Sequence, residues 1–382
     1  MGGRTTFLAL APFDRLRANG TGAIAFILAG CASPAPAPVL PDPMPDWKVS
    51  RDAPVIAAGS LRPQALWNDP SPLRTPDGYA LYMTSSVDAP FKPPVLPFRA
   101  VSRDGVRWAL SPATPLLSTA GGPYASIETP SVVRFAGRYW MGFTGVYADP
   151  DPSPMAIGLA VSPDGANWKV ADWTLLKATG EASDWNGYLV GEPGLVACGG
   201  ELLLYFSAVG AREGGGPPLQ SIGLIRSTDG VHFTAPEQVI TQGPLYPAAQ
   251  GYAGYSSPAA LADTDGAIDI FYSVAHVSPG ADPAWQQVAI HHARAADGVH
   301  FREDPAPLLT RASTGWTDGE ILAPGPLRDG GTIRLWFGGH VARGRLAPLI
   351  QRGIAGPEFG IGIATITADQ FTPPLTKKGT DR

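Results

Sequence analysis

A short motif recurs along the sequence at nearly constant intervals. Each copy places an Asp-Gly pair after an apolar run and carries an aromatic residue three positions beyond the Gly. The four copies are VSRDGVRW (101–108), VSPDGANW (161–168), RSTDGVHF (226–233) and RAADGVHF (294–301), and their Asp residues lie 60, 65 and 68 positions apart. Asp-Gly between strand-like runs favours a hairpin, because a type I′ turn needs positive φ at both central positions. The chain therefore repeats one hairpin-bearing unit.

A proline that opens an apolar run recurs in the same rhythm. These prolines are Pro70, Pro130, Pro193, Pro258 and Pro324, spaced 60, 63, 65 and 66 residues apart. Each is followed by a run with aromatics, as in RYWMGFTG (138–145), and a third run precedes the Asp-Gly turn, as in AIGLAVS (156–162). The unit is thus four strands, and it occurs five times. We predict an all-β fold, a five-bladed β-propeller with four-stranded antiparallel blades.

The repeat also predicts where the domain begins and how its ring closes. We expect a propeller over residues 47–382, with blades at approximately 60–117, 124–176, 187–240, 252–309 and 316–375. Trp47-Lys48-Val49-Ser50 repeats the pattern of Trp108-Ala109-Leu110-Ser111, an outer strand. This surplus strand could pair with the last blade and remove an open edge, although residues 371–375 compete for the same place.

Composition excludes several other classes. The 382 residues include 46 Gly and 41 Pro, and no tract longer than 14 residues lacks both, which excludes long helices and coiled coils. An apolar fraction of 44 % is too high for a disordered chain. The net charge is −5 and no cluster of Lys or Arg interrupts it, so we expect no nucleic-acid partner.

The first residues are interpreted as a targeting signal. Residues 1–31 carry arginines, then the apolar run Ala23–Leu28, then small residues, which is the layout of a secretory signal. Leu28-Ala29-Gly30-Cys31 resembles a bacterial lipobox, which implies cleavage before Cys31 and its lipidation. Residues 32–46 are a Pro-rich spacer. We expect an exported protein held in the bacterial cell envelope by its lipid anchor alone, with Cys198 left as a free thiol and no internal disulfide.

We expect the catalytic or binding residues at the start of each inner strand. Innermost strands of a propeller face a central channel, so equivalent residues converge there. The residues directly before the five prolines are Asp69, Thr129, Glu192, Ser257 and Ala323. Two of them are carboxylates, which are costly near a channel axis unless they have a partner or a function. Glu128 is a third candidate acid, although regular alternation would point it to the opposite face.

The residues around Asp69 and Glu192 resemble motifs of a known enzyme superfamily. Trp67-Asn68-Asp69-Pro70 looks like the WxNDP or NDP opening of the five-bladed propeller glycoside hydrolases, the superfamily that includes families 32, 43, 68, 117 and 130. Glu192-Pro193 resembles the motif that supplies their general acid. The resemblance implies cleavage of glycosidic bonds in oligo- or polysaccharides, with Glu192 as acid and Asp69 as base or nucleophile. That assignment agrees with the two carboxyl groups that glycoside cleavage requires.

The sequence departs from the superfamily at one position. Its members usually carry a third acid, an Asp before the second-blade Pro, where this chain has Thr129. Glu128 is one substitute, and Asp318 and Glu320 ahead of the fifth blade are others. A non-catalytic propeller that binds glycan or protein at the cell surface is therefore an alternative function. A glycoside phosphorylase is another, since five arginines that could bind phosphate cluster around blade five, namely Arg311, Arg334, Arg343, Arg345 and Arg352.

Further residues are candidates for substrate contact. Trp67, Trp185 and Trp316 precede inner strands and could stack on sugar rings, or they could pack between blades. Asn68 and Tyr255 are further candidate contacts. His276 and His340 end second strands, where an imidazole could meet a substrate hydroxyl or a channel ion, or serve the structure alone. We expect a monomer with a carbohydrate substrate and no required cofactor, and a Ca²⁺ or Na⁺ ion in the channel is left open. No GxGxxG, GxxxxGK[ST], HExxH or CxxC motif supports nucleotide or zinc chemistry.

Overall fold

Strands make up nearly all the regular structure in the computed structural model, which describes residues 40–44, 46–88, 92–148, 153–215, 218–277, 285–341 and 358–371. The expected signal segment with Cys31 and most of the spacer lie outside these ranges. In the described part of the chain, no helix is both long and apolar enough to cross a membrane.

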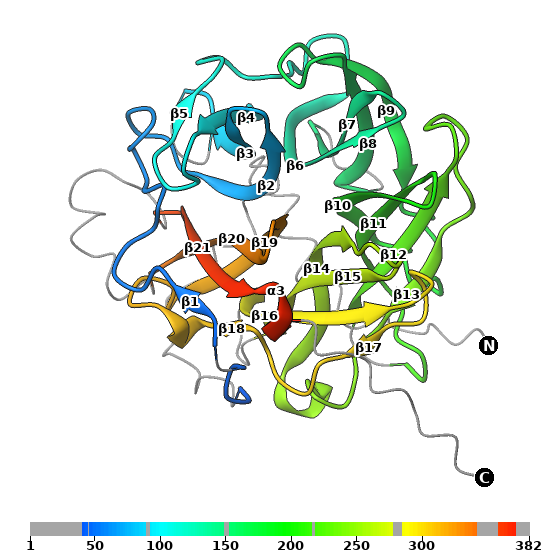
Figure 1. Ribbon diagram of the computed structural model, residues 1–382. Coiled ribbons are helices and arrows are strands. Elements are labelled where there is room, and N and C mark those ends of the chain that lie inside the picture. The colour runs from blue at the N-terminus through cyan, green and yellow to red at the C-terminus, as the bar shows by residue number, and fades with distance from the viewer. Residues whose placement is uncertain are drawn as a thin grey trace.

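The strands pair in five consecutive sets that surround the centre of the molecule (Figure 1). The first set is β2 (Asn68–Thr75), β3 (Gly78–Ser86), β4 (Val95–Ser102) and β5 (Ala109–Leu110). The second is β6 (Tyr124–Phe135), β7 (Arg138–Tyr147), β8 (Met155–Ser162) and β9 (Lys169–Lys177). The third is β10 (Leu189–Cys198), β11 (Glu201–Gly210), β12 (Leu219–Ser227) and β13 (Glu237–Ile240). The fourth is β14 (Tyr252–Ala262), β15 (Ile268–Val277), β16 (Trp285–Ala295), β17 (Arg302–Glu303) and β18 (Leu309–Thr310).

The fifth set joins the two ends of the described chain. It contains β19 (Glu320–Asp329), β20 (Thr332–His340) and β21 (Gly360–Thr367), and β1 (Lys48–Val49) pairs with the outer edge of β21. The N-terminal strand therefore closes the ring, as the repeated pattern suggested. Phe371, the start of the competing segment, instead ends the short helix α3 (Ala368–Phe371) and packs edge-on against Trp47 at a centroid distance of 6.0 Å. Residues 372–375 lie outside the described ranges.

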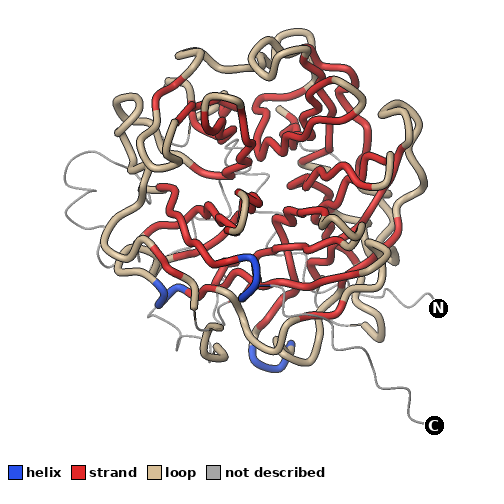
Figure 2. The backbone as a smooth tube through the Cα atoms, in the orientation of Figure 1, coloured by secondary structure: helices blue, strands red, loops and turns tan. Residues whose placement is uncertain are grey.

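Few elements other than strands are present in the described residues (Figure 2). Besides α3 there are two single-turn helices, η2 (Ala248–Gln250) and η3 (Arg311–Ser313). The third and fourth sets form one continuous sheet through a single parallel pair, Gln220 with Gly254. All other pairing between strands is antiparallel.

The residue before each of the five phased prolines has a left-handed backbone. The φ angles are 55° at Asp69, 50° at Thr129, 50° at Glu192, 49° at Ser257 and 50° at Ala323. Each lies where the pairing of inner and second strand shifts register. Non-glycine residues adopt positive φ only when surrounding contacts compensate for the strain. The same bulge therefore recurs in β2, β6, β10, β14 and β19.

A hydrogen bond between neighbouring sets holds four of these bulges. The backbone N–H of the left-handed residue donates to a hydroxyl on the second strand of the preceding set. The four bonds are Thr129 to Thr84 (2.9 Å), Glu192 to Thr144 (2.7 Å), Ser257 to Ser207 (2.8 Å) and Ala323 to Ser273 (3.0 Å). Each bond joins one set to the next near the axis, so it fixes the bulge and the packing of adjacent sheets together.

The fifth junction, between the last and first sets, is different. In the fourth set Ser273 pairs with Ser256 of the inner strand. In the fifth set the equivalent residue is Gly338 of β20, which pairs with Leu322 of the inner strand. A Cβ atom at Gly338 would collide with the Oδ1 atom of Asn68. The glycine is needed here because the Asn68 side chain fills the place that a hydroxyl takes elsewhere.

The Asp-Gly motifs do form the connection between third and fourth strands, but not as type I′ turns. Only the glycines have positive φ, between 72° and 78° at Gly105, Gly165, Gly230 and Gly298. The aspartates accept backbone hydrogen bonds instead, as Asp104 does from the N–H groups of Val106 (2.9 Å) and Arg107 (2.8 Å). The type I′ prediction was wrong because the Asp side chain stabilises a longer turn that needs positive φ at one position only.

Removing the hydroxyl of Ser273 tests the bond between sets. Ser273→Ala leaves the Ala323 N–H without its acceptor at a fully buried position, which we expect to lower the free energy of unfolding by about 1–3 kcal/mol. Ser256→Ala is the matched control. Ser256 pairs with Ser273 across β14 and β15 and is equally buried, yet its Oγ has no hydrogen-bond partner among the described residues. The control should be neutral or stabilising in urea unfolding, and equal losses in both variants would contradict the assigned role.

Candidate active site

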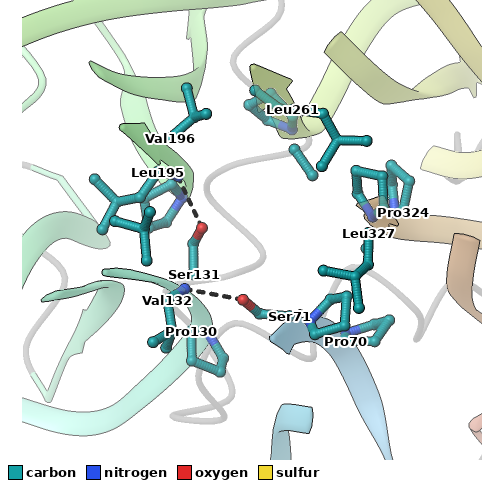
Figure 3. Close-up of a pocket in the computed structure, with 18 of the residues that line it drawn as sticks. Pro70, Ser71, Pro130, Ser131, Val132, Leu195, Val196, Leu261, Pro324 and Leu327 are labelled. Atoms are coloured by element: carbon teal, nitrogen blue, oxygen red, sulfur yellow. Dashed lines mark hydrogen bonds between the residues drawn. The ribbon is translucent and has the colours of Figure 1, made fainter. Parts of the chain in front are cut away.

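Two cavities meet at the left-handed residues near the axis. One, of about 310 Å³, is lined by the five phased prolines and by apolar side chains such as Leu195, Leu261 and Leu327 (Figure 3). The other, of about 160 Å³, contains the acids Asp69, Glu128, Glu192 and Glu320. Asp69, Thr129 and Glu192 line both cavities, so they form the boundary between them. The smaller cavity, called the acid cavity below, is the candidate site.

Two serines that follow phased prolines join the inner strands through a second series of hydrogen bonds. The hydroxyls that follow Pro70 and Pro130 accept N–H bonds from the next inner strand, Ser71 from Val132 at 2.9 Å and Ser131 from Leu195 at 2.8 Å (Figure 3). These bonds tie β2 to β6 and β6 to β10. The first three inner strands, which carry Asp69, Glu128 and Glu192, are thus joined directly to one another.

Glu128 shares the acid cavity with Asp69 and Glu192. Regular alternation would have turned Glu128 away from the residue at the next position, and the sequence prediction placed it on the opposite face. The left-handed backbone of Thr129 breaks that alternation, so Glu128 and Thr129 both line the cavity. Glu128 is 8 % exposed. The prediction of its orientation was wrong because positive φ at a non-glycine residue cannot be read from an alternating pattern.

Burial raises the pKa of two of these acids. The pKa of Asp69 rises to about 7, mainly through desolvation and further through the charge of Glu192, while a hydrogen bond with the Thr84 side chain acts in the opposite direction. The pKa of Glu128 rises to about 8 through desolvation and the charges of Asp69 and Glu192. The three carboxyl groups are therefore close enough to repel one another, and the cluster keeps a proton at neutral pH.

Glu192 is held by two donors. The Ser207 hydroxyl and the Ser257 N–H donate to its Oε2 atom, at 2.6 and 2.8 Å. Ser207 Oγ also accepts a bond from the Ser257 N–H at 2.8 Å. Both bonds end on Oε2, so the carboxyl group is anchored through one oxygen. Within the described residues, Oε1 has no hydrogen bond and can face a bound molecule.

Thr129 occupies the position where the superfamily that the sequence resembles usually has its third acid. Its side chain is bonded to the Thr144 hydroxyl at 2.5 Å, and Thr144 in turn accepts the Glu192 N–H. Thr129 therefore links the backbone of two acid-bearing strands. Glu128 brings the third carboxyl group to the cavity from the position before it.

Glu320 is a fourth acid of the cavity, and it explains the position of His340. The Nε2 atom of His340 lies 3.0 Å from Glu320 Oε2, and the Gln287 N–H donates to Glu320 Oε1 at 2.9 Å. His340 thus contacts a cavity acid without lining the cavity itself. His276 does not line it either, since its Nε2 atom lies 3.1 Å from the Gln250 carbonyl.

The aromatic residues proposed as a sugar platform are packing residues. Trp67 and Tyr255 are fully buried and Trp316 is 7 % exposed. Trp67 packs edge-on against Phe98, Tyr255 against Tyr272, and Trp316 stacks on Phe337. Trp185 packs against Phe206 and does not line the acid cavity. Of the two roles left open for the tryptophans, these contacts favour packing, because the rings fill the spaces around their own sheets. Asn68, by contrast, lines the cavity.

Sequence reasoning missed a set of cavity residues on the third strands or, for Phe359, directly before one. These are Val95, Met155, Gln220, Gln287 and Phe359, with Trp285 two residues before Gln287. A signal for three of them exists in the sequence, because Val95, Met155 and Gln220 each lie nine positions before the Asp of the repeated turn. Gln287 lies ten positions before Asp297, and a register shift between Val274 and Ala275 accounts for the extra residue. Among the described residues, no group of three or more His, Cys, Asp or Glu side chains has the arrangement to hold a metal ion.

Comparison with known proteins supports the fold. No protein-family model matches the sequence, and no curated protein sequence matches it. Solved structures do match in fold. A complex of BT0996 with RGII aligns with a TM-score of 0.63 at 14 % identity, over 87 % of this protein and 94 % of that one. A thermostable family-43 glycoside hydrolase gives 0.58 at 15 % identity, over 80 % and 91 %. The β-1,2-mannobiose phosphorylase from Listeria innocua gives 0.59 at 11 % identity, over 85 % and 97 %. The predicted all-β propeller is confirmed, and the protein shares this fold with glycoside hydrolases.

The raised pKa values predict how stability depends on pH. Between about pH 4 and 8 the folded cluster binds protons that the unfolded chain has lost, so the free energy of unfolding should fall as pH rises through this range. Glu128→Gln removes one such group. The decrease in the free energy of unfolding between pH 5 and pH 8.5 should then be smaller by about 2 kcal/mol or more. Urea unfolding at both pH values measures this. The same change at the exposed Glu181 is the control and should leave the pH dependence unaltered. An unaltered dependence in Glu128→Gln would contradict the protonated cluster.

Proposed function

We propose that the protein hydrolyses glycosidic bonds of a carbohydrate substrate in the acid cavity. The observation that carries the proposal is the convergence of Asp69, Glu128 and Glu192 from three neighbouring inner strands, with one or more protons retained near neutral pH. Cleavage of a glycosidic bond needs a group that protonates the leaving oxygen and a carboxylate that acts from the other side of the sugar ring. Solved glycoside hydrolases with the same propeller fold support this choice of chemistry.

In the proposed mechanism Glu192 is the general acid. Its Oε2 atom is fixed by Ser207 and Ser257, so Oε1 is the oxygen that delivers one of the protons shared by the acid cluster to the glycosidic oxygen. Asp69, bonded to Thr84, is the carboxylate that either activates a water molecule or attacks the anomeric carbon. Burial and the charges of Asp69 and Glu192 raise the pKa of Glu128 to about 8, so Glu128 keeps its own proton when those two acids are ionised. A protonated Glu128 adds no negative charge and can donate a hydrogen bond to the substrate.

Turnover of a panel of neutral and charged aryl glycosides and oligosaccharides tests the proposal. Asp69→Asn and Glu192→Gln should each lower kcat by about 10²- to 10⁴-fold, because each removes an acid–base or nucleophilic group. Glu181→Gln, an exposed substitution of the same type, should retain full activity. Binding of a carbohydrate without any turnover, unaffected by the two cavity substitutions, would sink hydrolysis and favour the non-catalytic surface propeller.

Phosphorolysis is a second candidate, favoured by the fold shared with the Listeria innocua phosphorylase. Of the five arginines considered for phosphate, Arg343, Arg345 and Arg352 lie outside the described residues. Arg334 is paired with Asp329 at 2.8 Å, and Arg311 is bonded to the Gly319 carbonyl beside Glu320. Including inorganic phosphate in the turnover assay separates the two reactions, since only phosphorolysis gives a sugar phosphate.

We also propose that the protein is exported and anchored through a lipid on Cys31. The support is the lipobox-like segment Leu28-Ala29-Gly30-Cys31, followed by the Pro-rich spacer. In a bacterial host fed a labelled fatty acid, the full chain should incorporate label and sediment with membranes, while Cys31→Ser should do neither. Cys198→Ser is the matched control and should behave as the unsubstituted chain. Label retained in Cys31→Ser would contradict the anchor.

A further inference from the structure

The acid cavity has the volume of one sugar ring. Its volume is about 160 Å³. For comparison, an engineered protein cavity of about 150 Å³ binds one benzene molecule, which is also a six-membered ring. The boundary formed by Asp69, Thr129 and Glu192 separates it from the proline-lined cavity. A cavity of this volume suits the end of a carbohydrate chain rather than an internal stretch of several sugars.

The charges of the cavity favour a neutral sugar. Four carboxyl groups line it, on Asp69, Glu128, Glu192 and Glu320, and within the described part of the chain no Lys or Arg side chain does. His340 is near, but it is engaged with Glu320. A uronate or sulfated ring would bring another negative charge next to these acids, and no Lys or Arg among the described lining residues would pair with it. The cavity therefore disfavours acidic sugars.

Three amide side chains in the cavity have oxygen atoms without a partner. Gln220 is 7 % exposed, and its Oε1 atom is buried without a hydrogen bond among the described residues. The same holds for Gln287 Oε1 and Asn68 Oδ1. All three side chains line the acid cavity. Buried acceptors without partners are rare because they lose hydration without a replacement. These oxygens are closed off from solvent, so each amide has to turn toward the cavity for a sugar hydroxyl to supply the missing donor.

Strand β16 presents an aromatic ring beside one of these amides. Trp285 and Gln287 are two residues apart and both line the cavity, which agrees with side chains that alternate along a strand. The Gln287 N–H is bonded to Glu320 Oε1, so the strand is fixed against the fifth set at this point. An apolar surface next to a few fixed polar groups is the usual composition of a small-molecule pocket. It matches a sugar ring, which has C–H faces and hydroxyl edges.

We propose that the acid cavity binds a single neutral sugar at the end of a carbohydrate chain, and that Gln220 and Gln287 select it by binding its hydroxyl groups. This inference rests on the proposed function, since it names the substrate class of the same cavity. The acids of the first three sets act on the glycosidic bond, while β12 and β16 hold the terminal ring. Cleavage then releases one sugar per event from the chain end.

The test uses Gln→Met substitutions, which keep the side-chain length and remove the amide. With the neutral aryl glycoside that the wild type hydrolyses fastest, Gln220→Met and Gln287→Met should each lower kcat/KM by about 5- to 50-fold, with an unchanged pH profile. Gln238→Met is the matched control. Gln238 lies on β13, donates to Ser221 at 2.8 Å and does not line the cavity, so this variant should keep wild-type kcat/KM. Wild-type kcat/KM in both cavity variants would overturn the assignment.

Two further measurements separate this inference from the proposed hydrolysis. Aryl glucuronide and galacturonide should be turned over at least 100-fold more slowly than the matched neutral glycosides, and a polysaccharide should release monosaccharide without an early fall in polymer size. Equal turnover of the acidic glycosides, or an early fall in polymer size, would overturn the inference while leaving hydrolysis intact.

The absence of turnover on every substrate would overturn the proposed function. Calorimetric binding of neutral monosaccharides to Glu192→Gln, weakened by a further Gln220→Met change, would then still support neutral-sugar recognition, and unweakened binding would contradict it.

Discussion

The hydrogen bond from a left-handed residue to the hydroxyl of the preceding sheet is the contact on which the centre of this propeller depends. Positive φ at a non-glycine residue costs about 1–3 kcal/mol, and the bond at Thr129, Glu192, Ser257 and Ala323 offsets that cost while joining neighbouring sheets. The same backbone geometry breaks the alternation of side chains. Consecutive residues such as Glu128 and Thr129 then face one cavity. Sheet packing and the clustering of acids therefore have a common origin.

The fivefold repeat is used unequally around the axis. Residues at equivalent positions are acids in the first and third sets, and Ser257 and Ala323 in the fourth and fifth. At the junction of last and first sets, Gly338 makes room for Asn68, whose buried amide oxygen has no hydrogen-bond partner among the described residues. The third strands add Gln220 and Gln287 only in the third and fourth sets. The repeat supplies equivalent places, and substitutions at those places divide the cavity into an acidic part and an amide-bearing part.

The sequence predicts those places better than it predicts side-chain directions. Constant spacing located the prolines at the inner strands, and the likeness of Trp47-Lys48-Val49-Ser50 to an outer strand indicated how the ring closes, because both depend on backbone pairing that repeats. For Glu128 regular alternation indicated the opposite face, because the left-handed backbone of Thr129 has no signature in residue type. For Trp67, Trp316 and Tyr255 the sequence could not separate a packing role from substrate contact, because core and binding site use the same aromatic residues. Trp285 was missed since it lies outside the repeated aromatic strands.

A second buried acid in the same protein shows what the acid cavity lacks. Asp269, 1 % exposed, is bonded to Arg294 through both oxygens at 2.8 Å, and it also lies 3.2 Å from His292 and 3.7 Å from Arg328. That carboxylate is fully compensated, as a structural buried charge must be. Burial also acts on Asp69 and Glu128, but the charges that act on these two carboxyl groups are those of other acids, and their pKa values rise accordingly. Within the part of the chain that the structure describes, one buried acid is paired with cations and the acids of the cavity are not, and carboxyl groups with retained protons are what the proposed acid–base chemistry requires.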